Sequence, residues 1–139
     1  MAVPFNIIAL DVGEKRVGIA KASSEAKLAR PIKTLNRSDT FFKELRALIE
    51  DEGASFLVIG LPQGLSGQDT DQTAKTHLFI SELESQIDLP VYLEDESYSS
   101  VRAEETLSAL KKDYSKADID AQAASHILED FINNHPEVF

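Results

Sequence analysis

The stretch NIIALDVGEKRVGIA, residues 6–20, decides how the rest of the chain is interpreted. Apart from Asn6, Phe5 to Leu10 is an apolar run, which is typical of a central strand buried on both faces. Gly13 permits a turn after it. Apolar and polar residues alternate sufficiently over 16–22 to predict the second strand of a hairpin. Asp11 ends the apolar run, and burying an unpaired carboxylate costs several kcal/mol. Asp11 is therefore either a solvated residue at the strand end or the first ligand of a metal site.

The rest of the chain is predicted to alternate strands with helices. Apolar periodicity and turn residues predict further strands within 29–35 and at 55–59 and 90–93, and helices at about 39–53, 70–85, 99–112 and 119–133. Ser38 or Asp39 is expected to cap the first helix, and Ser99 or Ser100 the third. The polar segment QGLSGQDTD, residues 63–71, is expected to be a mobile loop.

This order of elements is a hairpin followed by alternating helices and strands, with two helices last. Such an order predicts a mixed sheet with helices packed against it. We therefore expect an α/β fold of the ribonuclease H-like class, with a mixed five-stranded sheet and helices packed on both faces. A chain of 139 residues is long enough for one domain, 1–139, with a sizeable core.

The composition excludes several classes of protein. Apolar residues make up 42% and charged residues 27%, which is typical of a globular rather than a disordered chain. No segment approaches the roughly 18 consecutive apolar residues of a membrane span, and no secretory signal is recognised. Cysteine is absent, which excludes disulfides and thiolate metal sites. A cytoplasmic location without a membrane partner is expected.

Charge is distributed unevenly along the chain. The net charge is −10, which by itself argues against nucleic acid, because phosphate binding needs cations. Residues 1–37, however, hold seven basic and three acidic residues, a balance of +4, and the remainder has a balance of −14. A basic first quarter on an acidic body is compatible with one positive face for nucleic acid. A generally acidic, well-solvated surface is the alternative.

A second group of acids lies in LEDES, residues 93–97. Three consecutive acids at a strand end repel one another unless a cation lies near. If Leu93 points into the core, Asp95 lies on the same face of the strand, while Glu94 and Glu96 lie on the other. Periodicity therefore leaves both Asp95 and Glu96 as candidate ligands. Glu94 is expected to be a solvated loop residue.

A third acid, Asp120, lies in DIDAQAASHILEDF, residues 118–131. On a helix, Asp120 shares a face with an apolar stripe made of Ala123, Ala124, Ile127, Leu128 and Phe131. Small residues in this helix would allow it to approach the strands closely and bring Asp120 near Asp11. Asp118 is expected to cap the helix, where it would also benefit from the helix dipole.

Three such acids could hold one or two Mg²⁺ ions, or Mn²⁺ in their place. Mg²⁺ prefers oxygen ligands, keeps several waters and is typically bound by a few carboxylates together with substrate phosphate. A pair of such ions activates water and stabilises the leaving oxygen in phosphodiester cleavage. The candidate ligands are Asp11 and Asp120, with Glu96 or Asp95 as the third.

Four motifs give the chain a specific resemblance to one family. LDVGEKRVGIA (10–20), VIGLPQGLSG (58–67), VYLEDESYSSVRAEE (91–105) and DIDAQAASHILEDF (118–131) occur in the order seen in the YqgF family, also called RuvX. The likeness covers about residues 6–132. It implies a ribonuclease H-like fold and a part in maturation of the 5′ end of 16S ribosomal RNA. Some members of the family have instead been assigned cleavage of Holliday junctions.

The resemblance also implies roles for particular residues. The family's first-strand aspartate falls on Asp11, the acid of its Asp-Glu motif on Glu96, and its helix aspartate on Asp120. Its basic pair after the first strand is matched by Lys15 and Arg16. Its Gly-Leu-Pro motif is matched by residues 60–62, with Gly67 closing the loop.

The chain departs from the family pattern at three places. Ser97 stands where the family usually has an arginine, Ser99 and Ser100 replace what are commonly threonines, and Gly64 lies near a usual asparagine. Loss of the arginine removes a cation from beside the acids without removing a metal ligand. The fold inference is unaffected by these changes, whereas the inference about activity is weakened.

The expected function is that of a metal-dependent nuclease acting on pre-16S rRNA. Asp11, Glu96 and Asp120 would bind Mg²⁺, and Lys15 and Arg16 would hold the nucleic-acid backbone, which is a sequence-independent task. Alternatives are a junction resolvase acting on structured DNA and a non-catalytic ribosome-assembly factor. A nucleotide-binding protein of the actin and sugar-kinase type needs far more residues. The chain could be a monomer or a homodimer.

Overall fold

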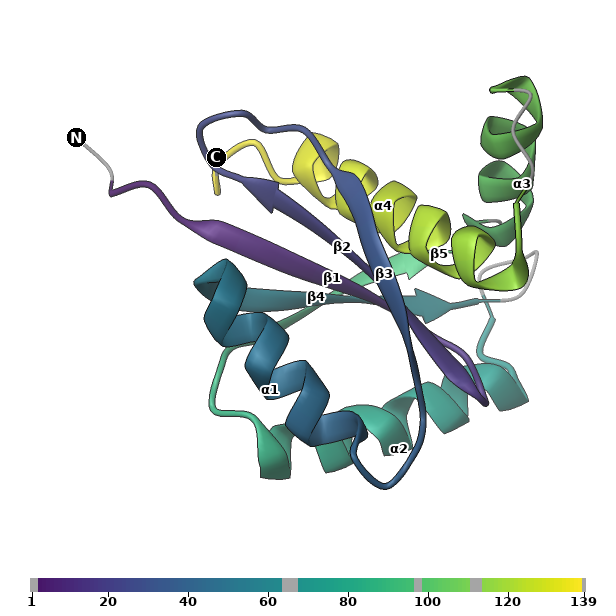
Figure 1. The fold of residues 1–139 in the computed structure, drawn as a ribbon, viewed down its shortest axis with the longest axis horizontal. Coiled ribbons are helices and arrows are strands. Elements are labelled where there is room, and N and C mark those ends of the chain that lie inside the picture. The colour runs from purple at the N-terminus through teal and green to yellow at the C-terminus, as the bar shows by residue number, and fades with distance from the viewer. Residues whose placement is uncertain (1–2, 64–67, 97–98, 111–113, 139) are drawn as a thin grey trace.

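The computed structural model describes residues 3–63, 68–96, 99–110 and 114–138 (Figure 1). Within these ranges the chain forms a sheet and its covering helices. In chain order the elements are β1 (Asn6–Val12), β2 (Arg16–Ser23), β3 (Arg30–Asn36), α1 (Phe41–Glu52), β4 (Ala54–Pro62), α2 (Asp71–Gln86), β5 (Val91–Glu96), α3 (Ser99–Ala109) and α4 (Lys116–Asn134).

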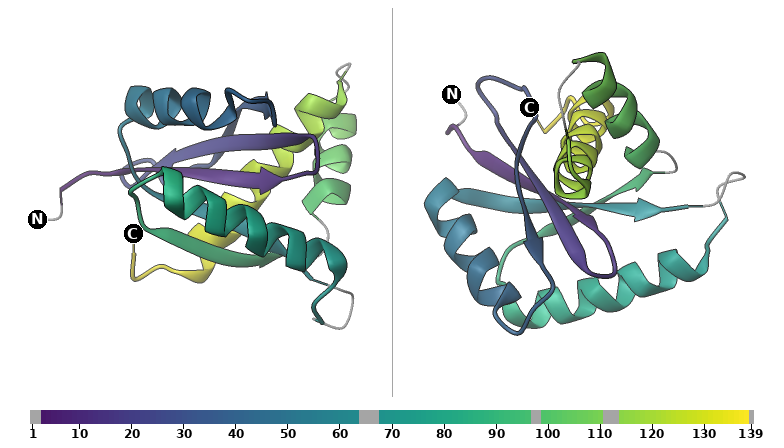
Figure 2. Two further views of the ribbon diagram at one scale, coloured as in Figure 1. Left: turned by 90° about the horizontal axis from the view of Figure 1, so that it is seen from below. Right: turned by 45° about the vertical axis from the view of Figure 1, so that its right-hand side comes forward.

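The strands form one mixed sheet in the order β3-β2-β1-β4-β5. β1, β2 and β3 pair antiparallel, whereas β4 pairs parallel with both β1 and β5. Helix α4 crosses one face of the sheet, and α1 and α2 lie on the other (Figures 1 and 2). The predicted five-stranded mixed sheet with helices on both faces is confirmed.

The face toward α1 and α2 holds the larger core. Alternation along the central strands directs Ile8 and Leu10 of β1, and Ile59 of β4, to this face. They meet the buried residues of the two helices, which are Phe41, Leu45 and Leu48 of α1 and Phe79, Ile80 and Leu83 of α2. Bulky aliphatic and aromatic side chains therefore fill this layer.

The face toward α4 holds a smaller core. The sheet contributes three alanines, Ala9, Ala20 and Ala22, together with larger residues such as Ile7. Helix α4 contributes the apolar stripe expected from the sequence, with Ala124, Ile127, Leu128 and Phe131 buried. This layer is thinner, and α4 lies close to the strands.

Several predicted boundaries were wrong. β4 continues to Pro62 and β5 to Glu96, so both strands are about three residues longer than predicted at their carboxyl ends. Helix α4 begins at Lys116, and its cap is Ser115 rather than Asp118. The Asp118 side chain instead accepts a hydrogen bond from the Ser115 N–H, which completes a capping box.

The first helix also lacks its predicted cap. Thr40, and neither Ser38 nor Asp39, precedes α1, and no side chain caps that helix. The side chains of Ser99 and Ser100, the predicted caps of α3, are outside the described part of the structure. The same holds for residues 111–112 at the end of the predicted span of α3 and for residues 64–67 of the predicted mobile loop. No helix in the described ranges is both long enough and apolar enough to cross a bilayer.

Candidate active site

Two of the predicted acids lie where parallel strands end at one edge of the sheet. β1, β4 and β5 run parallel, so their carboxyl ends share an edge, which is where open α/β sheets place ligands. Asp11 is the penultimate residue of β1, and Glu96 is the last residue of β5, opposite Pro62 of β4. Because β5 is longer than predicted, the acidic residues 94–96 belong to the strand itself.

The alternation of side chains decides which acids share a face. Asp11 follows Ile7 and Ala9, which both lie on the α4 face. Glu94 also lies on that face, because it accepts a 2.6 Å hydrogen bond from Asn134 of α4. Alternation then directs Glu96 to the α4 face and Asp95, which is exposed, to the other. Glu96 is therefore the better candidate of the two.

Gly18 allows Asp120 of α4 to lie close to Asp11 of β1. It is the register partner of Asp11 on β2, and a β-carbon there would collide with the backbone carbonyl oxygen of Asp120. The first turn of α4 thus lies directly on β2, one strand from Asp11. Sequence reasoning missed Gly18, although a glycine inside a strand often marks close approach of another backbone.

The pair of carboxylates is electrostatically strained. Asp11 is half-buried at the sheet edge, and burial, followed by the nearby charge of Asp120, raises the pKa of Asp11 from 3.8 to about 7. Two carboxyls so placed do not both ionise readily without a cation. The proximity expected from the small residues of α4 is therefore present.

Arg16 supplies part of the compensating charge. Its Nε lies 2.8 Å from Oδ2 of Asp120, and both side chains are partly exposed. Arg16 is thus engaged with a candidate ligand rather than presented to solvent. Lys15, in the turn between β1 and β2, is exposed.

The turn that carries Lys15 is held by several contacts. The Gly13 N–H donates to the Arg16 carbonyl at 2.8 Å, and Arg37 Nη1 donates to the Gly13 carbonyl at 3.0 Å. The Arg37 guanidinium also lies 5.1 Å from the centre of the Phe79 ring. Glu14 of the same turn forms an ion pair with Lys75 of α2, and this contact lowers the pKa of the Glu14 carboxyl.

The three carboxylates do not form one tight cluster. In the described part of the chain, no three Asp, Glu or His side chains come close enough together to hold a metal ion between them. β4 lies between β1 and β5, which separates the strands of Asp11 and Glu96 by about 9–10 Å. Mg²⁺ commonly uses one or two carboxylates, waters and substrate phosphates. Asp11 and Asp120 alone fit that donor set.

Glu94 was predicted to be solvated, and this was wrong. It is only 7% exposed, because the carboxyl end of α4 covers it. Besides the bond from Asn134, its Oε2 lies 3.4 Å from Nε2 of His135, whose ring packs against Phe131 with centroids 4.4 Å apart. These contacts fix α4 to β5 two residues before Glu96, and no sequence signal pointed to them.

Some residues singled out from the sequence cannot be placed. Gly64, Gly67 and Ser97 lie outside the described residues, and the side chains of Ser99 and Ser100 do as well. The Gly60-Leu61-Pro62 motif is the carboxyl end of β4. A β-carbon at Gly60 would collide with the Ile127 side chain, so this glycine also admits α4 to the sheet.

Comparison with known proteins gives one family. The RuvX family, described as Holliday junction resolvase, matches residues 5–134. A protein of Maridesulfovibrio salexigens named "Putative pre-16S rRNA nuclease" is 39% identical over 132 residues, which cover 92% of this chain and 98% of that protein. A protein of the same name from Roseiflexus sp. is 36% identical over 135 residues, covering 94% and 96% of the two chains.

Solved structures with the same fold include two resolvases. T. thermophilus RuvC in complex with a Holliday junction substrate has a TM-score of 0.55 at 10% identity, covering 94% of this chain and 95% of that one. The fowlpox virus Holliday junction resolvase has a TM-score of 0.53 at 12% identity, covering 97% and 100%. At these identities the likeness concerns the fold alone, and it confirms the predicted ribonuclease H-like class.

Proposed function

This chain belongs to the RuvX family, and we propose that it is a metal-dependent nuclease that cleaves phosphodiester bonds in the maturation of the 5′ end of pre-16S rRNA. The relatives at 39% and 36% identity bear the name of such a nuclease and cover almost the whole chain. A cytoplasmic location is part of this proposal.

One observation supports the chemistry above all others. Asp11 and Asp120, which the family resemblance assigns to catalysis, come from positions more than a hundred residues apart and meet beside Gly18. Their mutual repulsion contributes to the raised pKa of Asp11. A divalent cation would relieve that repulsion and hold both carboxylates in the ionised form.

The proposed metal is Mg²⁺, with Mn²⁺ as a substitute. When bound, such an ion supplies an activated water and stabilises charge on the phosphate oxygens. Asp11 and Asp120 would hold it, after Asp11 has lost its proton. Glu96 lies on the same face at the end of β5. It would bind either the same ion, through a water or a substrate phosphate, or a second ion nearby.

The two basic residues of the turn then have different tasks. Arg16 orients Asp120 through the 2.8 Å contact and offsets its charge. Lys15 is exposed beside the site and would contact the phosphate backbone of the substrate without reading its sequence. This division refines the expectation that both residues hold nucleic acid.

The test is cleavage of a labelled pre-16S rRNA fragment by purified protein with Mg²⁺ and with EDTA. Asp11→Asn should reduce Mg²⁺-dependent cleavage to background, because a neutral amide is a poor ligand for this ion. Asp95→Asn is the matched control, since Asp95 is exposed on the opposite face of β5, and it should cleave normally. Retained cleavage in Asp11→Asn would remove Asp11 from the mechanism.

A second substrate is included in the same assay because of the family description. A four-way DNA junction, cleaved in preference to the RNA, would identify the chain as a junction resolvase. Such an enzyme must cut two strands symmetrically and would act as a dimer. RNA binding without any Mg²⁺-dependent cleavage would instead identify a non-catalytic assembly factor.

A further inference from the structure

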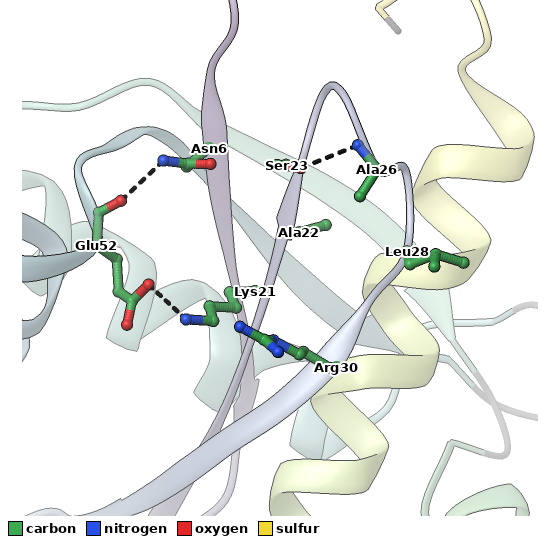
Figure 3. A pocket seen from close by; sticks show the side chains of 8 residues that line it. All are labelled: Asn6, Lys21, Ala22, Ser23, Ala26, Leu28, Arg30 and Glu52. Atoms are coloured by element: carbon green, nitrogen blue, oxygen red, sulfur yellow. Dashed lines mark hydrogen bonds and ion pairs between the residues drawn. The ribbon is translucent and has the colours of Figure 1, made fainter.

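Two cations face each other across the β2–β3 pair, on the opposite side of the sheet from the carboxylates. Lys21 of β2 and Arg30 of β3 are register partners, and Figure 3 shows both side chains lining one pocket. Lys21 Nζ lies 2.8 Å from Oε2 of Glu52 on α1. In the chain as described, the Arg30 side chain makes no hydrogen bond or ion pair.

The pocket has a volume of about 500 Å³ and an excess of positive charge. Its polar lining comes from Asn6, Lys21, Ser23, Arg30 and Glu52, and the Asn6 amide holds the Glu52 backbone carbonyl at 3.0 Å. Like charges directly opposite each other on paired strands destabilise a sheet. A single carboxylate offsets one of the two cations, so an anion in the pocket would stabilise this arrangement.

A line of further cations leads from this pocket to the candidate active site. β3 is the edge strand, and Lys33 on it is exposed. At the far end of β3 the Arg37 N–H donates to the Lys15 carbonyl, which places Lys15 beside that end. A strand rises about 3.3 Å per residue, so the edge from Arg30 to Asn36 spans about 20 Å. Neither the Lys15 nor the Lys33 side chain is hydrogen-bonded or ion-paired to any described residue.

The opposite edge of the sheet has the opposite charge. Asp95 of β5 is exposed there, and so are Glu104 and Glu105 of α3, the helix that follows it. Clefts and edges of one sign steer a polyanion toward the positive side of a molecule. Four cations of the basic first quarter, Lys15, Lys21, Arg30 and Lys33, thus lie along the β2–β3 side of the sheet.

We propose that the pocket between Lys21 and Arg30 binds a phosphate group of a nucleic-acid strand, and that the β3 edge carries the backbone of that strand toward the carboxylates. This inference rests on the proposed function. The pocket lies on the α1 side of the sheet and the carboxylates on the α4 side. A strand that meets both therefore passes around the open edge at Lys33.

The competing explanation is that charges on an edge strand only prevent association with another sheet. Lysine and proline on edge strands serve that purpose in many proteins, and β3 holds Pro31 next to Arg30. Under that explanation the cations would affect oligomeric state and would leave nucleic-acid binding unchanged. The experiment below separates the two.

The experiment measures the binding of fluorescein-labelled single-stranded RNA, and of a labelled four-way DNA junction, by fluorescence anisotropy over a salt series. All proteins carry Asp11→Asn to prevent cleavage. The test variant adds Arg30→Gln and Lys33→Gln. The matched control adds Lys43→Gln and Arg46→Gln, which remove the same charge from α1. Arg46 reaches Gln86 at the end of α2, and Lys43 lies one turn before it.

The test variant should bind RNA several-fold more weakly than its parent. The plot of log affinity against log salt should become shallower by roughly 1.4, because each lost phosphate contact on a single strand accounts for about 0.7. The control pair should leave the slope unchanged. Equal losses in both variants, or no loss in the test variant, would overturn the proposal.

Three further measurements keep the outcomes distinct. Thermal melting checks that both variants are folded, and size-exclusion chromatography shows whether the test variant associates. Association with an unchanged salt slope overturns the proposal in favour of edge protection. Inorganic phosphate, titrated by NMR, shows whether the pocket takes the free anion. Phosphate binding with an unchanged RNA slope would overturn the nucleic-acid role.

Failure of the proposed function is recognised separately. A wild-type chain that binds RNA through this edge but cleaves neither substrate with Mg²⁺ would contradict the nuclease and leave this inference standing. A wild-type chain that cleaves RNA while the test variant binds with an unchanged slope would contradict the inference alone.

Discussion

The two faces of the sheet are built from different kinds of residue. The face under α1 and α2 is filled by large side chains such as Leu45, Ile59 and Phe79. The face under α4 is lined by alanines and by Gly18 and Gly60, and all three candidate catalytic acids lie at its edge. The large side chains of the first face stabilise the fold, and the two glycines of the second let α4 reach the strands.

The difference has a physical consequence for the chemistry. A helix separated from the sheet by large side chains would hold Asp120 too far from Asp11 to influence its pKa. Close approach instead brings the two carboxylates together in a half-buried place, where each disfavours the charge on the other. Close packing on the α4 face thus has an electrostatic cost, which a bound cation would offset.

The largest expected effect is on the α1 and α2 face and should be purely structural. Leu45→Ala should lower the free energy of unfolding by about 3 kcal/mol, because it leaves a cavity among fully buried residues. Leu78→Ala on α2 is the control, since Leu78 is 72% exposed and its loss should change stability by less than about 0.5 kcal/mol. Urea unfolding measures both. Cleavage per folded molecule should be unchanged, and a reduced rate would contradict the separation of the two faces.

The next effect is on the α4 face and should alter the site as well. Gly18→Ala should cost about 2 kcal/mol, because the added carbon meets the Asp120 backbone and displaces the first turn of α4. Val17→Ile adds one carbon to the other face at the adjacent, fully buried residue and should cost a similar amount, about 1–3 kcal/mol, but without affecting cleavage. Urea unfolding and cleavage assays compare them. Normal cleavage by Gly18→Ala would show that close approach is not needed for the site.

The pH dependence of the free energy of unfolding should further distinguish the α4 face, which carries Asp11, from the other. Between about pH 4 and 7 the folded chain retains a proton on Asp11 that the unfolded chain has released, so the free energy of unfolding falls as the pH rises through this range. Without metal, Asp11→Asn should therefore be more stable than the wild type near pH 8, where the folded wild type must ionise this buried carboxyl. That difference should vanish near pH 4.

Metal provides the control for this measurement. Mg²⁺ should raise the melting temperature of the wild type at pH 8, because binding to the folded state stabilises it. The same addition should have no effect on Asp11→Asn. A stability difference that does not change with pH would mean that Asp11 is not destabilised by its surroundings.

The smallest expected effect concerns the far end of α4. Asn134→Ala should cost about 1 kcal/mol, because it removes the 2.6 Å hydrogen bond to the buried Glu94 carboxylate. Asn133→Ala is the matched control, since Asn133 is exposed, and it should change the unfolding free energy by less than about 0.5 kcal/mol. Chemical unfolding under identical conditions compares the two, and equal costs would show that the bond does not fix α4 to β5.

Much of the fold followed from local patterns in the sequence. The apolar run at residues 5–10 predicted the central strand, and the stripe from Ala123 to Phe131 predicted the buried face of the last helix. Both predictions succeeded because burial of apolar surface dominates where such patterns are long. Boundaries were less accurate, as at the start of α4, where Ser115 and Asp118 could each serve as a cap.

The sequence by itself determined the succession of strands and helices, the family, and which acids are candidates for the site, because these depend on the type and spacing of residues. Only the tertiary structure decided which acids meet. Glu94 is buried because the end of α4 covers it, Asp120 lies beside Asp11 because Gly18 has no side chain, and Arg16 pairs with an acid far along the chain. Contacts between distant segments depend on how helices and strands pack together, and periodicity along one segment contains no information about that packing.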